Sequence, residues 1–173
     1  MPALRRTWLV AGLAGLVSCA HGVGAEGAAS FAQCAAALPG PSVSEVPFQP
    51  SRLRGKVVLV TFIATWCFPC LADLVSLDKL ERELGPKGFE NVVVGMDLEG
   101  AQVLVPFAAN YQFQYPVIAA TESLRSGETP FGRIRELPTR VLFGRDGQVV
   151  GAWAGVFPWP TLSKTVADEV GRK

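Results

Sequence analysis

Two cysteines, Cys67 and Cys70 in the stretch ATWCFPCLAD, have the residue type and spacing to do chemistry. Such a pair could bind a metal ion, cross-link the chain as a structural disulfide, or exchange electrons with another protein. Each of these uses needs different surroundings, so the rest of the chain has to decide among them.

The positions of the other possible ligands argue against a metal site. A structural zinc ion takes four ligands, but Cys19, the only histidine (His21) and Cys34 all lie near the N-terminus. A copper site or a cysteine protease would also need a histidine in the folded part. A structural cross-link is disfavoured because bridges stabilise most when they close long loops. We therefore expect no metal and no cofactor other than a redox-active Cys67–Cys70 disulfide. Cys34 could be a spare thiol or could form a bridge of its own.

The elements around the pair predict how it is positioned. The run KVVLVTFIA, residues 56–64, is apolar and β-branched, as is typical of a strand buried on both faces. Leucines recur at spacings of three and four over residues 71–84, which predicts a helix that ends at Gly85 and Pro86. Cys67 then lies where a buried strand passes into a helix. The partial positive charge and free N–H groups of the helix N-terminus favour its nucleophilic thiolate form.

Cys70 lies one helical turn further along, on the same face as Cys67. It can therefore attack the mixed disulfide that Cys67 forms with a partner, and so release that partner. Pro69 between them lacks an N–H group, which costs nothing in the first turn of a helix. We predict that Cys67 is the attacking thiol and that Cys70 is the resolving thiol.

The remaining pattern predicts a mixed sheet. A second buried strand over residues 91–96 precedes a helix over 102–111 and a short helix that begins at 129–130. The segments TRVLF and QVVGAW flank the turn GRDG as a hairpin, and a last helix opens near Pro160. This order predicts an α/β fold over residues 47–173, with a central mixed β-sheet flanked by helices on both faces.

The composition limits the class of protein. A chain of 173 residues that is 49% hydrophobic and 18% charged can form one folded domain with a proper core. The formal net charge is +1 and no block of lysines and arginines occurs. We therefore expect no binding to nucleic acid.

The N-terminal residues are typical of an export signal. Two arginines precede the apolar run WLVAGLAGLV, which is shorter than the roughly 20 residues of a comfortable membrane span. The sequence LVSC resembles a bacterial lipobox, so we expect a signal peptide over residues 1–19 and lipidation of Cys19. Cleavage after Ala25 and an uncut anchor are the alternatives. Residues 20–46 are rich in Ala, Gly and Ser and are expected to be a tether, within which a short helix could form around FAQCAAAL. The protein is thus expected to be periplasmic or extracytoplasmic and anchored to the membrane.

Two segments carry a specific resemblance. The segments LRGKVVLVTFIATWCFPC and RELPTRVLFGRDGQVVGAWAG are similar to the two signatures of the thioredoxin superfamily, and within it to the exported TlpA/ResA-like branch. The similarity covers about residues 48–173. It implies a thioredoxin-like fold and thiol:disulfide oxidoreductase activity. It also implies that Pro138 is a cis-proline facing the cysteines, with the backbone of Leu137 able to pair with an extended substrate strand.

The resemblance also suggests how protons are handled. Asp73 follows Cys70 by three residues, where the TlpA/ResA-like branch often has an acidic residue, usually Glu. Such a carboxylate could take the proton from Cys70, although Asp73 could equally be a solvated helix residue. Thr61 stands where cytoplasmic thioredoxins carry a buried Asp, which leaves Asp73 as the main candidate.

The neighbours of Cys67 are expected to contact substrate. Trp66 adjoins the attacking thiol as in the family and is expected to shield the site. Phe68 and Pro69, the residues between the cysteines, influence the reduction potential. Because Phe68 brings no positive charge to stabilise the thiolate, it favours a reductant over an oxidant.

The resemblance implies a function in the cell envelope. We expect the protein to reduce disulfides in exported proteins, for example in cytochrome c maturation or in the assembly of oxidase copper centres. A membrane thiol reductase would then supply the electrons. The alternatives are a disulfide donor that uses the same site, and a non-catalytic or copper-binding module on a thioredoxin scaffold.

Overall fold

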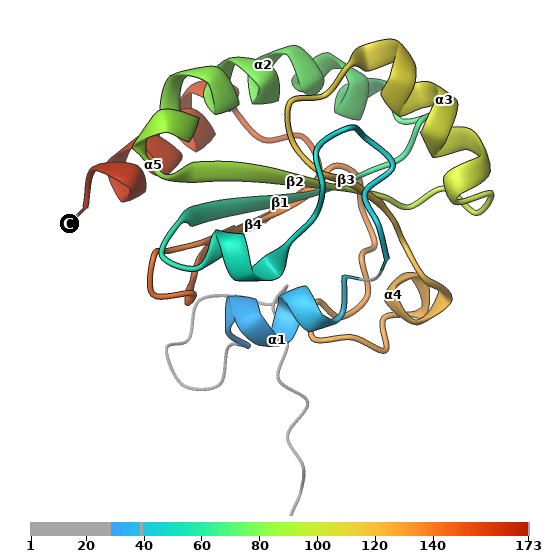
Figure 1. The fold of residues 1–173 in the computed structure, drawn as a ribbon, viewed down its shortest axis with the longest axis horizontal. Coiled ribbons are helices and arrows are strands. Elements are labelled where there is room, and N and C mark those ends of the chain that lie inside the picture. Colours follow the sequence, from blue (N-terminus) through green and yellow to red (C-terminus); the bar gives the residue numbers. More distant parts are fainter. Residues whose placement is uncertain (1–28, 39, 173) are drawn as a thin grey trace, which may run out of the picture.

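The computed structural model describes residues 29–38 and 40–172, and its centre is a five-stranded sheet of order β3-β2-β1-β4-β5 (Figure 1). The strands are β1 (Val57–Ile63), β2 (Phe89–Gly95), β3 (Val117–Ala119), β4 (Thr139–Phe143) and β5 (Val149–Ala154). Strands β1, β2 and β3 pair in parallel, whereas β4 is antiparallel to both β1 and β5. The sheet is therefore mixed, as predicted, and the hairpin β4–β5 lies where the sequence placed it.

Helices cover both faces of this sheet, which confirms the expected fold class (Figure 1). On one face lie α2 (Phe68–Leu84), α3 (Ala101–Tyr111) and α5 (Trp159–Gly171), and on the other lie α1 (Phe31–Ala36) and α4 (Glu122–Ser126). Two 3-10 turns, η1 (Pro50–Leu53) and η2 (Gly85–Lys87), complete the element order. In the part of the chain that the structure describes, no helix is both long and apolar enough to cross a membrane.

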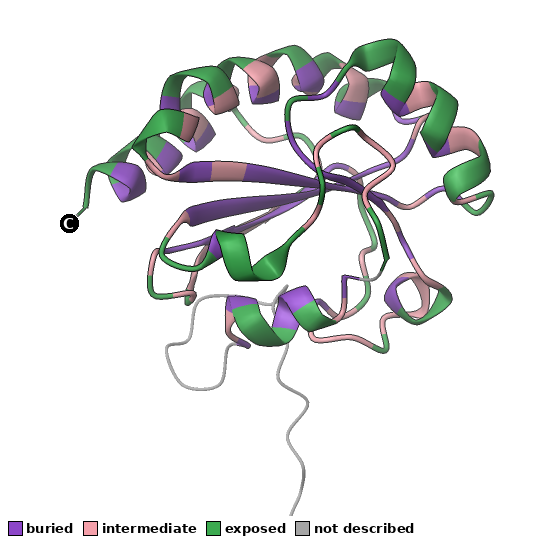
Figure 2. Ribbon diagram, in the orientation of Figure 1, coloured by how far each residue is buried: buried purple, intermediate pink, exposed green. Residues whose placement is uncertain are grey.

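The burial of β1 explains its unbroken apolar sequence. Leu59 and Ile63 face the core under α2 and α5, while Val60 and Phe62 face the core that contains α1 and α4. Figure 2 shows β1, β2 and β4 almost entirely buried between the two helical layers. A strand covered on both sides is a rigid support, and β1 leads directly into the loop that carries Cys67.

The structure differs from the expected tether over residues 20–46, in the part that it describes. Helix α1 buries Phe31 and Cys34 against the sheet, and the Ser42 hydroxyl accepts a hydrogen bond from the backbone N–H of Val117 at 3.0 Å. This segment therefore belongs to the fold. Its few large apolar side chains are spaced among alanines, so the composition resembles that of a linker. Cys34 is disulfide-bonded, so it is not a spare thiol. The expected signal peptide, Cys19 and the start of the tether lie outside the described residues.

The short helix before β4 also differs from the prediction. Helix α4 begins after Thr121, whose hydroxyl accepts a hydrogen bond from the N–H of Leu124 at 3.3 Å, and ends at Gly127. The predicted start at residues 129–130 is wrong. The backbone carbonyl oxygen of Thr129 instead accepts a hydrogen bond from the N–H of Gly132, which closes a turn. Gly127 has a positive φ of 86°, which suits a glycine at the end of a helix. Thr121 offered the same capping chemistry in the sequence.

Candidate active site

Helix α2 begins at the cysteine pair. Cys67 is the N-cap residue, and its Sγ accepts a hydrogen bond from the backbone N–H of Cys70 at 3.3 Å. The two sulfur atoms are joined in a disulfide of 2.06 Å. Cys70 is fully buried, whereas Cys67 borders a pocket at the surface. An outside molecule can therefore reach the sulfur of Cys67 before that of Cys70.

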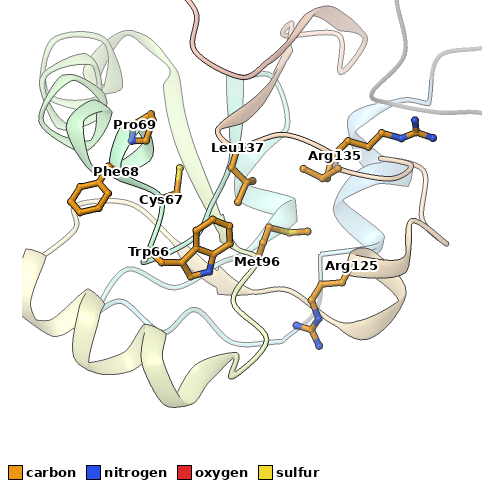
Figure 3. Close-up of a pocket in the computed structure, with 9 residues that line it drawn as sticks. Trp66, Cys67, Phe68, Pro69, Met96, Arg125, Arg135 and Leu137 are labelled. Carbon is orange, nitrogen blue, oxygen red and sulfur yellow. The ribbon is translucent and has the colours of Figure 1, made fainter.

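The pocket beside Cys67 has a volume of about 590 Å³ and is mainly apolar. Figure 3 shows the Cys67 side chain between the start of α2 and Leu137, with Trp66 and Met96 close by. The lining residues are Trp66, Cys67, Phe68, Pro69, Met96, Arg125, Ile134, Arg135 and Leu137. The side chains of Trp66 and Phe68 are 69% and 83% exposed. Such exposed aromatic surface around a reactive sulfur is typical of a contact site.

The loop that enters the site is held by Asp97, which we did not single out in the sequence. This buried carboxylate follows β2 and accepts hydrogen bonds from the Thr65 N–H at 3.0 Å and from the Thr65 hydroxyl at 2.6 Å. Backbone bonds continue the support, since the N–H of Cys67 donates to Ala64 O at 3.0 Å. The sequence signal was an acidic residue directly after a buried strand, where the carboxyl ends of parallel strands meet.

The second signature places a cis peptide bond beside the pocket. The Leu137–Pro138 peptide bond is cis, as the resemblance implied, and Leu137 lines the pocket opposite Cys67 (Figure 3). Pro138 is buried directly before β4. Strand β4 pairs with β1, so the two signatures, far apart in the chain, meet at one end of the sheet.

Behind the cysteines lies an ion pair between Asp73 of α2 and Arg140 of β4. The Nη2 of Arg140 donates to Oδ2 of Asp73, and the Arg140 side chain is completely buried while that of Asp73 is 26% exposed. Burial raises the pKa of Asp73 above its ordinary value, and the guanidinium charge of Arg140 opposes that rise. Asp73 is therefore not simply a solvated helix residue, the alternative that the sequence left open. Arg140 was also missed in the sequence, although a single arginine in the apolar strand TRVLF was a signal.

The expected site residues thus fall into two groups. Trp66, Cys67, Phe68, Pro69 and Leu137 line the pocket, whereas Cys70, Asp73 and Pro138 are not among its lining residues. Over residues 29–38 and 40–172, no group of three His, Cys, Asp or Glu side chains could hold a metal ion. A reachable sulfur at a helix N-terminus with a second sulfur in bonding distance can carry out thiol–disulfide exchange.

Comparison with known proteins agrees with this geometry. The family model described as Redoxin matches residues 28–170. The chain belongs to the Redoxin family. Within the thioredoxin superfamily it falls in the TlpA/ResA-like branch, because its curated relatives include several ResA proteins.

Two relatives of this Redoxin-family chain illustrate the similarity. The thiol-disulfide oxidoreductase ResA of Oceanobacillus iheyensis is 37% identical over 76 residues, which are 43% of this chain and 38% of the relative. ResA of Bacillus cereus is 30% identical over 99 residues, covering 57% of this chain and 54% of the relative. The alignments thus span about half or less of these relatives' length.

Solved structures confirm the thioredoxin-like fold. A thiol:disulfide interchange protein of the thioredoxin family from Chlorobium tepidum superposes with a TM-score of 0.62 and 28% identity, covering 77% of this chain and 96% of that protein. A secreted disulfide oxidoreductase of Mycobacterium tuberculosis has a TM-score of 0.62 and 18% identity, covering 78% and 97% of the two chains. The second similarity concerns the fold alone.

Proposed function

We propose that this protein is a thiol:disulfide oxidoreductase that reduces disulfides in exported proteins. The observation that carries the proposal is the position of Cys67, which caps α2, borders an open apolar pocket and is bonded to the buried Cys70. Relatives named thiol-disulfide oxidoreductase support the same chemistry.

The reaction proceeds in two exchanges. In the reduced protein the Cys67 thiolate attacks a substrate disulfide, and the first substrate sulfur leaves as a thiolate that takes a proton from water. Cys70 then attacks Cys67 in the mixed disulfide, its proton passes to the Asp73 carboxylate, and the second substrate sulfur leaves as a thiolate that also takes a proton from water. The substrate gains two electrons and two protons, and the protein is left with the Cys67–Cys70 disulfide.

The pocket would orient the substrate for the first exchange. Trp66, Phe68 and Pro69 supply apolar contact on the side of α2, and Leu137 supplies it across the pocket. The backbone of Leu137, next to the cis-proline Pro138, would pair with an extended substrate strand. No other cofactor takes part, because the sulfur pair carries both electrons.

The direction of electron transfer and the cellular location of the protein are inferred from the sequence. Phe68 adds no positive charge beside Cys67, which favours the reducing direction over disulfide donation. The apolar N-terminal run, which lies outside the described residues, would direct the protein out of the cytoplasm and hold it at the membrane. A membrane thiol reductase would return it to the reduced state. Suitable substrates are exported proteins whose cysteines must be reduced before they bind haem or copper.

A trapping experiment tests the proposal. Reduced full-length protein with Cys70→Ser is mixed with insulin, whose chains are joined by disulfides, and the products are analysed by mass spectrometry. We expect a covalent adduct through Cys67 that dithiothreitol releases, because the resolving thiol is missing. The matched control, Cys67→Ser with Cys70→Ser, should form none. Absence of the adduct, together with failure of the unmodified protein to reduce insulin, would refute the proposal.

A further inference from the structure

The Arg140–Asp73 ion pair differs from the other ion pairs of the described residues. The Arg140 side chain is completely buried, whereas in each of the other pairs both side chains are at least partly exposed. Arg140 lies near the start of β4, an inner strand of the sheet, where it is paired in register with Thr61 of β1 and Trp153 of β5. A positive charge is thus built into the interior, beneath the start of α2.

Packing alone does not account for this arginine. Its Nε is buried without a hydrogen-bond partner among the described residues, and its Nη1 has only a long contact of 3.5 Å to Gly155 O. Burying a charge costs free energy, and an apolar side chain of similar volume is often as stable or more stable at such a position. A buried donor left unsatisfied adds to that cost. The arrangement therefore calls for an explanation in the chemistry of the site.

The charged partner of Arg140 in the interior is Asp73. Thr61, its neighbour on β1, is uncharged, and Asp73 is the one charged group that acts on the pKa of Arg140 among the described residues. In return, Arg140 is the one charged group that acts on the pKa of Asp73. Asp73 lies three residues after Cys70, on the same face of α2. The guanidinium group is fixed by a central strand and presents a rigid set of donors to the carboxylate.

We propose that Arg140 is a positioning residue that holds the Asp73 carboxylate, ionised and in one orientation, as the proton acceptor for Cys70. The role rests on the proposed function. When Cys70 attacks Cys67, the new sulfur–sulfur bond forms, the bond from Cys67 to the substrate sulfur breaks, and the electron pair leaves with the substrate thiolate. The proton of Cys70 moves to Asp73, which can release it to water because part of its side chain is exposed. Without Arg140 the buried carboxylate would favour its protonated form and lose its fixed direction.

Reaction with 5,5′-dithiobis(2-nitrobenzoate) separates the two exchanges. Attack by Cys67 releases one coloured thiolate at a rate proportional to reagent concentration. Attack by Cys70 on the mixed disulfide releases a second one at a rate independent of that concentration. Reduced full-length protein is followed by stopped-flow absorbance, and the trace of Cys70→Ser, which lacks the second step, is used to subtract signal from other thiols.

For Arg140→Met we expect the second phase to slow at least about tenfold, since a positioned general base typically contributes about 10²–10⁴-fold. The first phase should stay within about twofold of the unmodified protein, because Cys67 does not use Asp73. Asp73→Asn should slow the same phase. The double variant Asp73→Asn with Arg140→Met should be no slower than Asp73→Asn alone, because Arg140 acts through Asp73.

Arg140→Lys is the second variant, in case Arg140→Met does not fold. It keeps the charge and should restore most of the second-phase rate, and its remaining defect should vanish when Asp73→Asn is also present. Additive effects of Arg140 and Asp73 substitutions, or an unchanged second phase in Arg140→Met, would overturn the inference. Absence of both phases in the unmodified protein would instead refute the proposed function.

Discussion

Trp66 and Phe68 on either side of Cys67 place large apolar side chains in water. Both line the pocket at the reactive sulfur, so a partner that reaches Cys67 must contact them. Val75, also on α2, has a similar exposure of 72% but is not part of the pocket lining. A comparison of substitutions at Phe68 and Val75 therefore separates the effect of pocket contact from the effect of exposed apolar area.

We expect Phe68→Ser to lower the rate of insulin reduction by about fivefold, which corresponds to about 1 kcal/mol of lost apolar contact. Its reaction with a small disulfide reagent should stay within about twofold, because Cys67 itself is unchanged. Val75→Ser is the matched control and should leave both rates unchanged. Equal slowing with both reagents, measured in parallel assays, would contradict a docking role for Phe68.

At the scale of elements, the site depends on the junction of β1, β2 and α2. Asp97 after β2 holds Thr65 in the loop between β1 and α2, and in this way fixes the point at which α2 starts. The N-terminus of α2 in turn directs its first N–H groups at Cys67. The position of the attacking sulfur is thus set by a side chain from a neighbouring strand.

Asp97→Ala should lower the free energy of unfolding by about 2 kcal/mol, because buried hydrogen bonds to a carboxylate are lost and the Thr65 N–H is left without its acceptor. Asp97→Asn keeps one acceptor oxygen and should lose clearly less. Urea unfolding of the oxidised protein measures both, with the exposed Glu99→Ala as control. If Asp97→Ala were as stable as the control, the loop would be held by other contacts.

For the molecule as a whole, Glu81 links the helical layer to the sheet. Its Oε2 accepts hydrogen bonds from the backbone and side-chain nitrogens of Asn91 on β2, at 2.8 and 3.0 Å. Burial raises the pKa of Glu81 from 4.5 to about 7, and the negative charge of Glu90 adds to this rise. The hydrogen bond from the Asn91 backbone and the positive charge of Lys56 oppose it. A raised pKa means that the folded protein binds the proton more tightly than the unfolded chain.

The stability that this proton contributes is fully present below about pH 4.5 and is lost as the pH rises through about 7. We expect Glu81 to account for a fall of about 3 kcal/mol in the free energy of unfolding over this range. Glu81→Gln, which keeps an acceptor for Asn91, should remove that part of the fall in urea titrations at several pH values. Glu83→Gln, an exposed change on the same helix, should not. Identical pH profiles for Glu81→Gln and the unmodified protein would rule out the effect.

Local patterns were sufficient for most of the fold. The strand over residues 56–64 and the leucine spacing of the next helix are short-range signals, because burial on a strand or helix face imposes a fixed period. The composition around Phe31, rich in Ala, Gly and Ser, indicates a tether with room for one short helix, and α1 forms at that place. Its apolar side chains become part of the core only because they pack against one face of the sheet.

The sequence by itself determined which atoms can react, since a cysteine pair at a strand-to-helix junction and a proline before a strand are local features. Only the tertiary structure decided what surrounds those atoms. Asp73 and Arg140 are 67 residues apart in the chain, and they meet because β4 pairs with β1 beneath α2. The pairing of a buried charge depends on which strands become neighbours, and no local pattern of residues specifies that.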